Sequence, residues 1–252
     1  MKVRILGCGS SGGVPRVGGS WGACDPTEPK NRRMRCSLLV TTDQGQILID
    51  TAPDMREQLL AAEVRALDSV FYTHLHADQA HGIDDLRALA LINRHRIPVY
   101  AEPDILDQLT TRFDYCFQQI KDYPPILDAN ALMGPIDRAG VTITPIRVQH
   151  GVIDATGYRI GNAAYFPDVS EIPEERFADL DGLELLIVDA LRYKPHPSHA
   201  HLDRALTWIE RIKPGRAVLT NLHMDLDYGT LCRTLPDGVV PAFDGMEIDL
   251  SD

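Results

Sequence analysis

Histidines gather in a few places in this 252-residue sequence, and imidazole is a frequent metal ligand and a carrier of protons near neutral pH. Of the nine histidines, only His95 lies outside four short segments. The others are His74, His76, His81, His150, His196, His199, His201 and His223. Such clustering favours a metal centre or an acid–base site over histidines scattered on a surface.

The segment THLHADQAHG, residues 73–82, is the densest of these groups. His74 and His76 are two residues apart and Asp78 is two further on, and this mixture of imidazole and carboxylate suits zinc, manganese or iron. On an exposed strand the three side chains would simply share one face. In a turn they can fan out, so that the two histidines bind one metal and Asp78 a neighbouring one. Gly82 is expected to allow the turn into the next helix.

Three further candidates, His150, Asp168 and His223, each come shortly after an apolar, β-rich run. Functional side chains gather where strands end, because loops there are held by a rigid scaffold. We therefore expect these residues to converge with the 73–82 segment.

The elements that must position these residues alternate between short apolar runs and amphipathic stretches. Strands are predicted at residues 3–6, 37–42, 46–50, 69–73, 141–148, 156–160, 163–166, 183–190 and 216–221. Helices are predicted at residues 54–66, 83–92, 103–116 and 202–213. Pro145 should mark a bulge or an edge of the sheet. The sequence predicts one α/β domain over residues 1–252, in which two β-then-α halves pack as a four-layer αββα sandwich.

The composition restricts the classes of function. Hydrophobic residues make up 44% and charged residues 24%, as in folded globular proteins. The net charge of −11 disfavours a large nucleic acid as partner. Five scattered cysteines do not form a disulfide framework and suit a reducing compartment. With no apolar run near the roughly 18 residues of a membrane span, we expect a cytoplasmic protein without a membrane partner.

The sequence resembles the metallo-β-lactamase superfamily, whose hallmark is HxHxDH followed by distant His, Asp and His. Six segments occur in the family's order: LGCGSSGGVPR (6–16), LIDTAPDMR (48–56), THLHADQAHGIDDLR (73–87), VQHG (148–151), FPDVS (166–170) and AFDGMEI (242–248). Within the superfamily it looks most like the phosphodiesterases of the carbon–phosphorus lyase pathway, which open cyclic ribose phosphates. AFDGMEI and PSHAHLDRAL carry that narrower resemblance.

The resemblance implies a centre of two divalent ions, zinc or manganese. One ion would be held by His74, His76 and His150. Asp168 would bridge the two ions, and Asp78 and His223 would hold the second.

One position departs from the family pattern, because the residue after Asp78 is Gln79 where the family has a second-site histidine. Three arrangements follow. The second ion keeps its remaining ligands with water completing its shell, or His81 substitutes from the next helical turn, or the second site is only partly filled. We favour the first.

The mechanism implied by a metal pair is attack of a metal-bound hydroxide on phosphorus. Asp78 would orient this nucleophile. By its match to the family segment, His199 is the general acid for the leaving alkoxide, and His196 and His201 are supporting, substrate-binding candidates.

Two other features leave alternatives open. The basic run KNRRMR, residues 30–35, is either an anion-binding rim or a solvated turn. Related phosphodiesterases can carry a structural zinc on a cysteine cluster after the first strand. Here that loop offers Cys24 and Cys36 without a CxxC pair, so we expect no structural zinc.

The function predicted is hydrolysis of a small cyclic nucleotide or ribose phosphate diester. The alternatives are a tRNA 3′-processing endoribonuclease, a thioester hydrolase of the same fold, and a metal- or ligand-binding protein with a degraded second site. The sequence leaves open whether the chain is a monomer or a homodimer.

Overall fold

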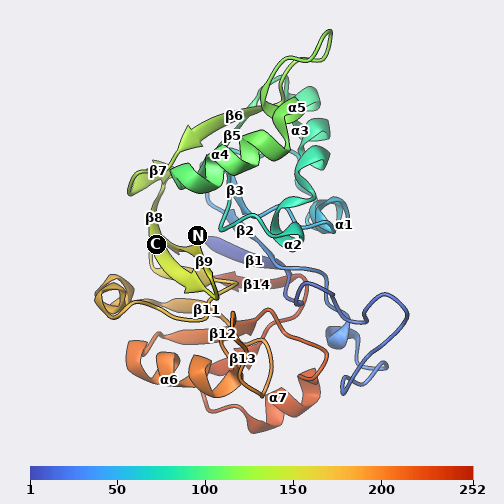
Figure 1. The fold of residues 1–252 in the computed structure, drawn as a ribbon. Coiled ribbons are helices and arrows are strands. Elements are labelled where there is room, and N and C mark those ends of the chain that lie inside the picture. Colours follow the sequence, from blue (N-terminus) through green and yellow to red (C-terminus); the bar gives the residue numbers. More distant parts are fainter. Residues whose placement is uncertain (252) are drawn as a thin grey trace.

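Two seven-stranded sheets face each other in the computed structural model, which describes residues 1–251 (Figure 1). The first sheet contains β1 (Lys2–Gly7), β2 (Ser37–Thr41), β3 (Gln46–Ile49), β4 (Ser69–Phe71), β5 (Ile97–Ala101), β6 (Leu127–Ala131) and β14 (Met246–Asp249), in the order β14-β1-β2-β3-β4-β5-β6. The second contains β7 (Ile136–Arg138), β8 (Val141–His150), β9 (Ile153–Ile160), β10 (Ala163–Phe166), β11 (Leu185–Asp189), β12 (Arg216–Thr220) and β13 (Val239–Pro241), in the order β13-β12-β11-β10-β9-β8-β7.

Helices cover the outer face of each sheet (Figure 1). The first sheet carries α1 (Met55–Ala61), α2 (Ala77–Ala80), α3 (Leu86–Asn93), α4 (Pro103–Arg112) and α5 (Asp114–Phe117). The second carries α6 (Leu202–Ile212) and α7 (Tyr228–Thr234). Short 3-10 helices span Pro29–Asn31, Ile83–Asp85 and Glu174–Leu180. The predicted four-layer αββα sandwich is therefore confirmed. Within residues 1–251, no helix has the length and hydrophobicity needed to cross a bilayer.

The two-residue period of the strands explains the layers, because successive side chains point to opposite faces of a sheet. In β3, Ile47 and Ile49 enter the central layer between the sheets, whereas Leu48 lies under the helices of the first sheet. In β11, Ile187 enters the central layer and Leu186 lies under the helices of the second sheet. Buried strands thus read as continuous apolar runs, since both of their faces are covered.

Strand direction brings the candidate site residues to one edge. The strands β3 and β4 are parallel, and so are β10, β11 and β12. Because β8 is antiparallel to β9, and β9 to β10, β8 runs in the same direction as β10. The last residues of β8 and β11 and the loops that follow β3, β4, β8, β10, β11 and β12 therefore carry the polar residues described below.

Pro145 lies where β8 has an open side, since β7 pairs only with residues 141–143, so the predicted sheet edge is confirmed. The prediction missed β5, β6, β7, β13 and β14, and also α2 and α7, and it joined α4 and α5 into one helix. These strands have three to five residues and include Pro98, Pro241 or at least one acidic residue. Their conformation comes from pairing with neighbouring strands, which local preference does not reveal.

Candidate metal centre

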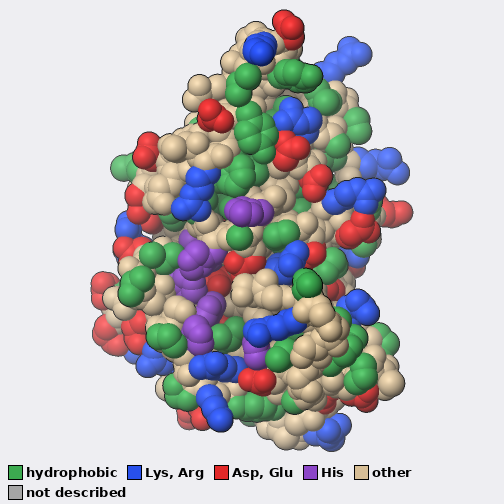
Figure 2. Space-filling view, turned by 45° about the vertical axis from the view of Figure 1, so that its right-hand side comes forward, with side chains coloured by type: hydrophobic (Ala, Val, Ile, Leu, Met, Phe, Trp, Pro, Cys, Tyr) green, Lys and Arg blue, Asp and Glu red, His purple; other side chains and the backbone are tan. Residues whose placement is uncertain are grey.

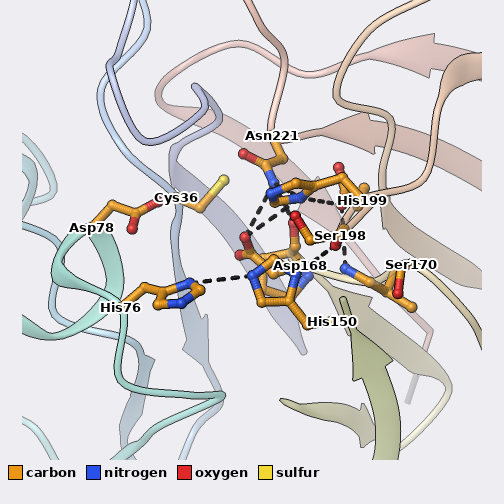
Figure 3. A network of polar contacts seen from close by, with 12 residues as sticks. Cys36, His76, Asp78, His150, Asp168, Ser170, Ser198, His199 and Asn221 are labelled. Atoms are coloured by element: carbon orange, nitrogen blue, oxygen red, sulfur yellow. Dashed lines mark hydrogen bonds and ion pairs between the residues drawn. The ribbon is translucent and has the colours of Figure 1, made fainter. Parts of the chain in front are cut away.

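Three histidine nitrogens converge where β4 and β8 end. His76 Nδ1 lies 3.0 Å from His74 Nε2 and 3.2 Å from His150 Nε2. Around a tetrahedral zinc ion with Zn–N bonds near 2.0–2.1 Å, neighbouring ligand nitrogens lie roughly 3.3 Å apart. Three ring nitrogens therefore already have close to the spacing that one ion requires, and Figure 3 shows His76 and His150 facing each other.

A backbone carbonyl fixes the tautomer of His150. The Nδ1 atom lies 2.6 Å from the oxygen of Ser198, and since a carbonyl only accepts, Nδ1 must donate its proton. The lone pair is then on Nε2, the nitrogen that faces His76. Burial, followed by the neighbouring His199, lowers the pKa of His150 to about 4. A neutral imidazole is the form that binds a metal.

A relay of hydrogen bonds holds His74. Thr73 Oγ1 lies 2.8 Å from Asp50 Oδ2 and 3.0 Å from His74 Nδ1. When Asp50 is ionised, Thr73 donates to it and its oxygen accepts the Nδ1 proton of His74, which directs the Nε2 lone pair at the cluster. Burial raises the pKa of Asp50 to about 8 and so disfavours its carboxylate form. A positive charge at the centre would act in the opposite direction and favour the carboxylate that this relay requires. Burial also lowers the pKa of His74 well below its usual value.

Asp168 and Asp78 are joined by the amide of Gln79. The Gln79 Nε2 atom lies 2.9 Å from Asp168 Oδ2 and 3.3 Å from Asp78 Oδ2. Gln79 is 0% exposed, and among the described residues its Oε1 has no hydrogen-bond partner. On the other side of the carboxyl group, Asn221 Nδ2 donates to Asp168 Oδ1 at 3.3 Å. Both oxygens of Asp168 thus accept amide protons.

A buried ion pair positions His199, the predicted general acid. Its Nδ1 lies 2.8 Å from Asp189 Oδ2 and 3.7 Å from Asp168 Oδ1. Burial acts to lower the pKa of His199, but the charge and hydrogen bond of Asp189, with the charges of Asp168 and Asp78, raise it to about 9. The ring is therefore protonated at neutral pH and, with Nδ1 engaged, can donate from Nε2.

His223 contacts an arginine. Its Nε2 lies 2.7 Å from Arg16 Nη2, and because a guanidinium group only donates, Nε2 must accept. The Nδ1 atom lies 3.2 Å from Asp225 Oδ2 and can donate to it. His223 thus contacts Arg16 at Nε2, and at Nδ1 it contacts both the carboxylate and the backbone nitrogen of Asp225, the latter at 3.3 Å; neither residue belongs to the predicted ligand set.

A pocket of about 160 Å³ adjoins these groups. Its lining residues are Ser10, Ser11, Arg16, Leu191, Arg192, His196, His199, Asn221 and His223. Figure 2 shows histidine side chains gathered near the middle of this face. Two guanidinium groups and three imidazoles make the pocket attractive to an anion.

The structure separates some predicted residues from this centre. Within residues 1–251, the sets of three mutually close ligand atoms are His74, His76 and His150, and His150, Asp168 and His199. His81 is exposed, and its ring packs edge-on against Phe113 with the ring centroids 5.9 Å apart. His201 directly precedes α6 and is not among the pocket-lining residues, whereas His196 is. The two-metal arrangement stays a prediction.

Two local interpretations need correction. Gly82 has an ordinary φ of −88°, so the turn itself does not require glycine. A Cβ at this position would lie 2.1 Å from the Ala52 carbonyl oxygen, so close backbone approach excludes a larger residue.

Much of the basic run 30–35 is structural rather than a rim or a solvated turn. Arg33 is 2% exposed and donates to the carbonyl oxygens of His223 and Leu226. Lys30 lies over the rings of Tyr228 and Phe243.

Sequence reasoning missed Arg16, Asp189 and Asn221 as members of the site. A signal existed for Asp189, which is the next-to-last residue of the apolar run 183–190, and for Arg16, which closes the glycine-rich segment 6–16. For Asn221 a backbone signal appears only in the structure, since its φ of 59° is uncommon for a residue other than glycine.

Known proteins resemble this chain in sequence and in fold. A family model described as a beta-lactamase superfamily domain matches residues 46–224. A solved structure described as a new diphosphatase from the PhnP family is 35% identical, with a TM-score of 0.92, and the match covers 99% of this chain and 98% of that one.

Two curated relatives also match nearly the whole chain. An octanoyltransferase of Porphyromonas gingivalis is 38% identical over 98% of this chain, which spans about half (51%) of that longer protein. Coenzyme PQQ synthesis protein B of Cupriavidus necator is 25% identical, and the match covers 99% of each chain.

Proposed function

The chain belongs to the metallo-β-lactamase superfamily and is a metal-dependent hydrolase, and from that premise we propose that it hydrolyses a small phosphodiester, such as a cyclic nucleotide or a ribose phosphate diester. The observation that carries the proposal is the cationic pocket beside the three-histidine cluster, lined by Arg16, Arg192 and His196. Arginine is the side chain best suited to phosphate oxygens, because its planar fork donates two parallel hydrogen bonds.

The size of the pocket favours a small substrate. Pockets for drug-sized ligands usually measure about 300–1,000 Å³, and this one measures about 160 Å³. It therefore suits a phosphate group and part of its substituent. The net charge of −11 opposes a long polyanion such as a tRNA, whose phosphates would meet repulsion outside the pocket.

The residues present fit a metal ion of the kind this superfamily uses. His74, His76 and His150 would hold it, with hydrogen bonds behind two of the rings already fixing their lone pairs. We propose zinc or manganese, because both accept imidazole ligands. When bound there, the ion supplies a water activated at neutral pH and neutralises charge on the phosphoryl group.

The chain's own residues would carry the proton transfers. Asp78 is half-buried beside the cluster and would accept a proton from the attacking water. His199 would donate from Nε2 to the leaving oxygen, while Asp189 holds the ring protonated and oriented. Arg16 and Arg192 would bind the phosphate oxygens and stabilise charge as the bond to phosphorus breaks.

Hydrolysis of a diphosphate is a second candidate, favoured by the 35% identical structure that is described as a diphosphatase. The leaving groups of the two reactions differ: a sugar alkoxide needs protonation, whereas a phosphate leaves readily without it. Dependence on His199 therefore separates the two candidates. The name octanoyltransferase assigns no activity to this chain, because about half of that protein lies outside the match.

Turnover by the metal-reconstituted enzyme tests the proposal, with 2′,3′-cyclic AMP, ADP-ribose, precursor tRNA and an acyl thioester as substrates. We expect turnover of the cyclic nucleotide and a roughly 10²–10⁴-fold lower kcat in His199→Gln, with metal content unchanged. The matched control is His95→Gln, an exposed histidine outside the site, which should leave kcat unchanged.

If the wild-type enzyme cleaves only ADP-ribose, the second candidate, hydrolysis of a diphosphate, replaces hydrolysis of a phosphodiester as the proposed function. Turnover of the tRNA or the thioester alone, or of none of the four compounds, would refute both candidates.

A further inference from the structure

We infer that this chain builds a one-metal centre. The side chains that would otherwise hold a second divalent ion are hydrogen-bonded within the protein instead, Asp78 and Asp168 to the Gln79 amide and His223 to the Arg16 guanidinium. The inference rests on the three-histidine site of the proposed hydrolase and is independent of its substrate. Figure 3 shows Asp78 set apart from the group formed by His150, Asp168 and His199.

The first observation concerns the orientation of Gln79. Its Nε2 faces one oxygen of Asp168, at 2.9 Å, and one of Asp78, at 3.3 Å. The opposite orientation would place the amide oxygen against the same two carboxylate oxygens, where every partner is an acceptor. The amide therefore donates, and the carboxylate oxygens that would bind an ion are already hydrogen-bonded.

A second observation is that both carboxylate oxygens of Asp168 already have a hydrogen-bond donor in the protein. Asp168 is 3% exposed, and a buried carboxylate requires donors or a cation to compensate for lost hydration. Gln79 donates to Oδ2 and Asn221 to Oδ1. The Nδ1 atom of His199 lies 3.7 Å from Oδ1. A protein donor therefore already faces each oxygen that a bridging ion would use.

The third observation is independent of Gln79 and concerns His223. An imidazole ring that carries a proton on one nitrogen has one lone pair, and that of His223 accepts from Arg16 Nη2 at 2.7 Å. The same lone pair cannot bind a metal at the same time. Moreover, a guanidinium fixed at this distance would repel a divalent ion placed beside the ring.

These contacts explain how a one-metal centre could still bind an anionic substrate. Arg16 lines the pocket together with Arg192 and gives the substrate side of the centre a positive charge that does not depend on metal supply. For a second ion to bind with water completing its shell, Arg16 would have to leave His223, and Gln79 Nε2 would have to leave its place between the Asp78 and Asp168 carboxylates.

The test is a metal count that requires no turnover. Wild-type protein is saturated with zinc and, separately, with manganese, exchanged into metal-free buffer, and analysed by plasma mass spectrometry. We expect about one ion per chain, and in the manganese sample the EPR spectrum of isolated rather than spin-coupled ions. Two ions per chain, or a coupled spectrum, would overturn the inference.

Variants test the roles of the two residues. In Gln79→His combined with Arg16→Ala, a histidine can join Asp78, Asp168 and a freed His223, so we expect about two ions per chain. Gln44→His adds a histidine at an exposed site and should remain at one. A folded double variant that still binds one ion would refute the assignment to Gln79 and Arg16.

If the buried Gln79 position does not tolerate histidine, Asp78→Asn gives an independent result. A one-metal centre on the three histidines should keep its single ion, whereas a two-metal centre should lose one of two. Because none of these measurements uses a substrate, a failed metal count leaves the proposed phosphodiester hydrolysis to be judged by its own assay.

Discussion

Replacing Thr73 by valine should weaken metal binding without touching any of the three histidines. Thr73 is 1% exposed, and valine has nearly the same shape, so the packing around it is retained. The substitution removes the hydroxyl that lies 2.8 Å from Asp50 Oδ2 and 3.0 Å from His74 Nδ1. His74 then loses the acceptor that holds its proton on Nδ1.

The expected loss of metal affinity follows from the hydrogen bond that the substitution removes from His74. Removing a partner that orients a metal-binding histidine typically lowers metal affinity by about 10–100-fold. This corresponds to about 1.4–2.7 kcal/mol. Asp50 keeps the backbone amide of Thr73 at 2.8 Å but has one oxygen unpaired, which should cost the folded state about 1–3 kcal/mol.

The assay is competition for zinc between the protein and a chromophoric chelator at pH 7.5, with unfolding by urea measured in parallel. Thr73→Ser keeps the hydroxyl and should bind zinc like the wild type. If folded Thr73→Val bound zinc within about twofold of the wild type, the hydrogen bond would not orient His74 and the reasoning would be wrong.

Three further predictions concern folding stability. In Gly82→Ala the new methyl would lie 2.1 Å from the Ala52 carbonyl oxygen, so we expect a loss of about 1–3 kcal/mol in urea unfolding, and an unchanged midpoint would contradict the close approach. In Asn31→Ala the loop 25–33 loses a fully buried side chain that makes four hydrogen bonds. The free energy of unfolding should therefore fall by about 2–4 kcal/mol. The control is Asn130→Ala, on the edge strand β6. Burial raises the pKa of Asp244 to about 7 from 3.8. The native state therefore binds a proton that the unfolded state does not, and this contribution to stability is complete below about pH 4 and lost as the pH rises through about 7. The stability of the wild type relative to Asp244→Asn should accordingly fall between pH 5 and pH 7, and a difference independent of pH would refute the assignment.

The strand pattern predicted the central strands and the layered fold, and the 73–82 segment predicted two of the three clustered histidines. Alternating burial is a local property, so the central strands and the layered fold could be inferred from apolar runs of strand length. The two-residue spacing of His74 and His76 also acts locally, since it places both rings at the end of one strand. His150 could be added because it ends another strand.

Whether Asp168 and His223 can bind a second ion depends on contacts between residues that lie far apart in the sequence. Gln79 meets Asp168 across 89 residues, and Arg16 meets His223 across 207 residues. From the sequence, His223 and Asp168 had the right residue types to bind an ion. Whether their lone pairs are free is decided by which donors the packed sheets bring beside them.

The sequence by itself therefore determined the sandwich and the candidate ligands, because side-chain type and strand period are read directly along the chain. Only the tertiary structure decided which of those ligands face one another and which are already hydrogen-bonded, because a hydrogen bond depends on positions within a few tenths of an ångström. Asp189, which ends a strand and supports His199, is visible in the sequence as a residue but acquires its role only through that contact.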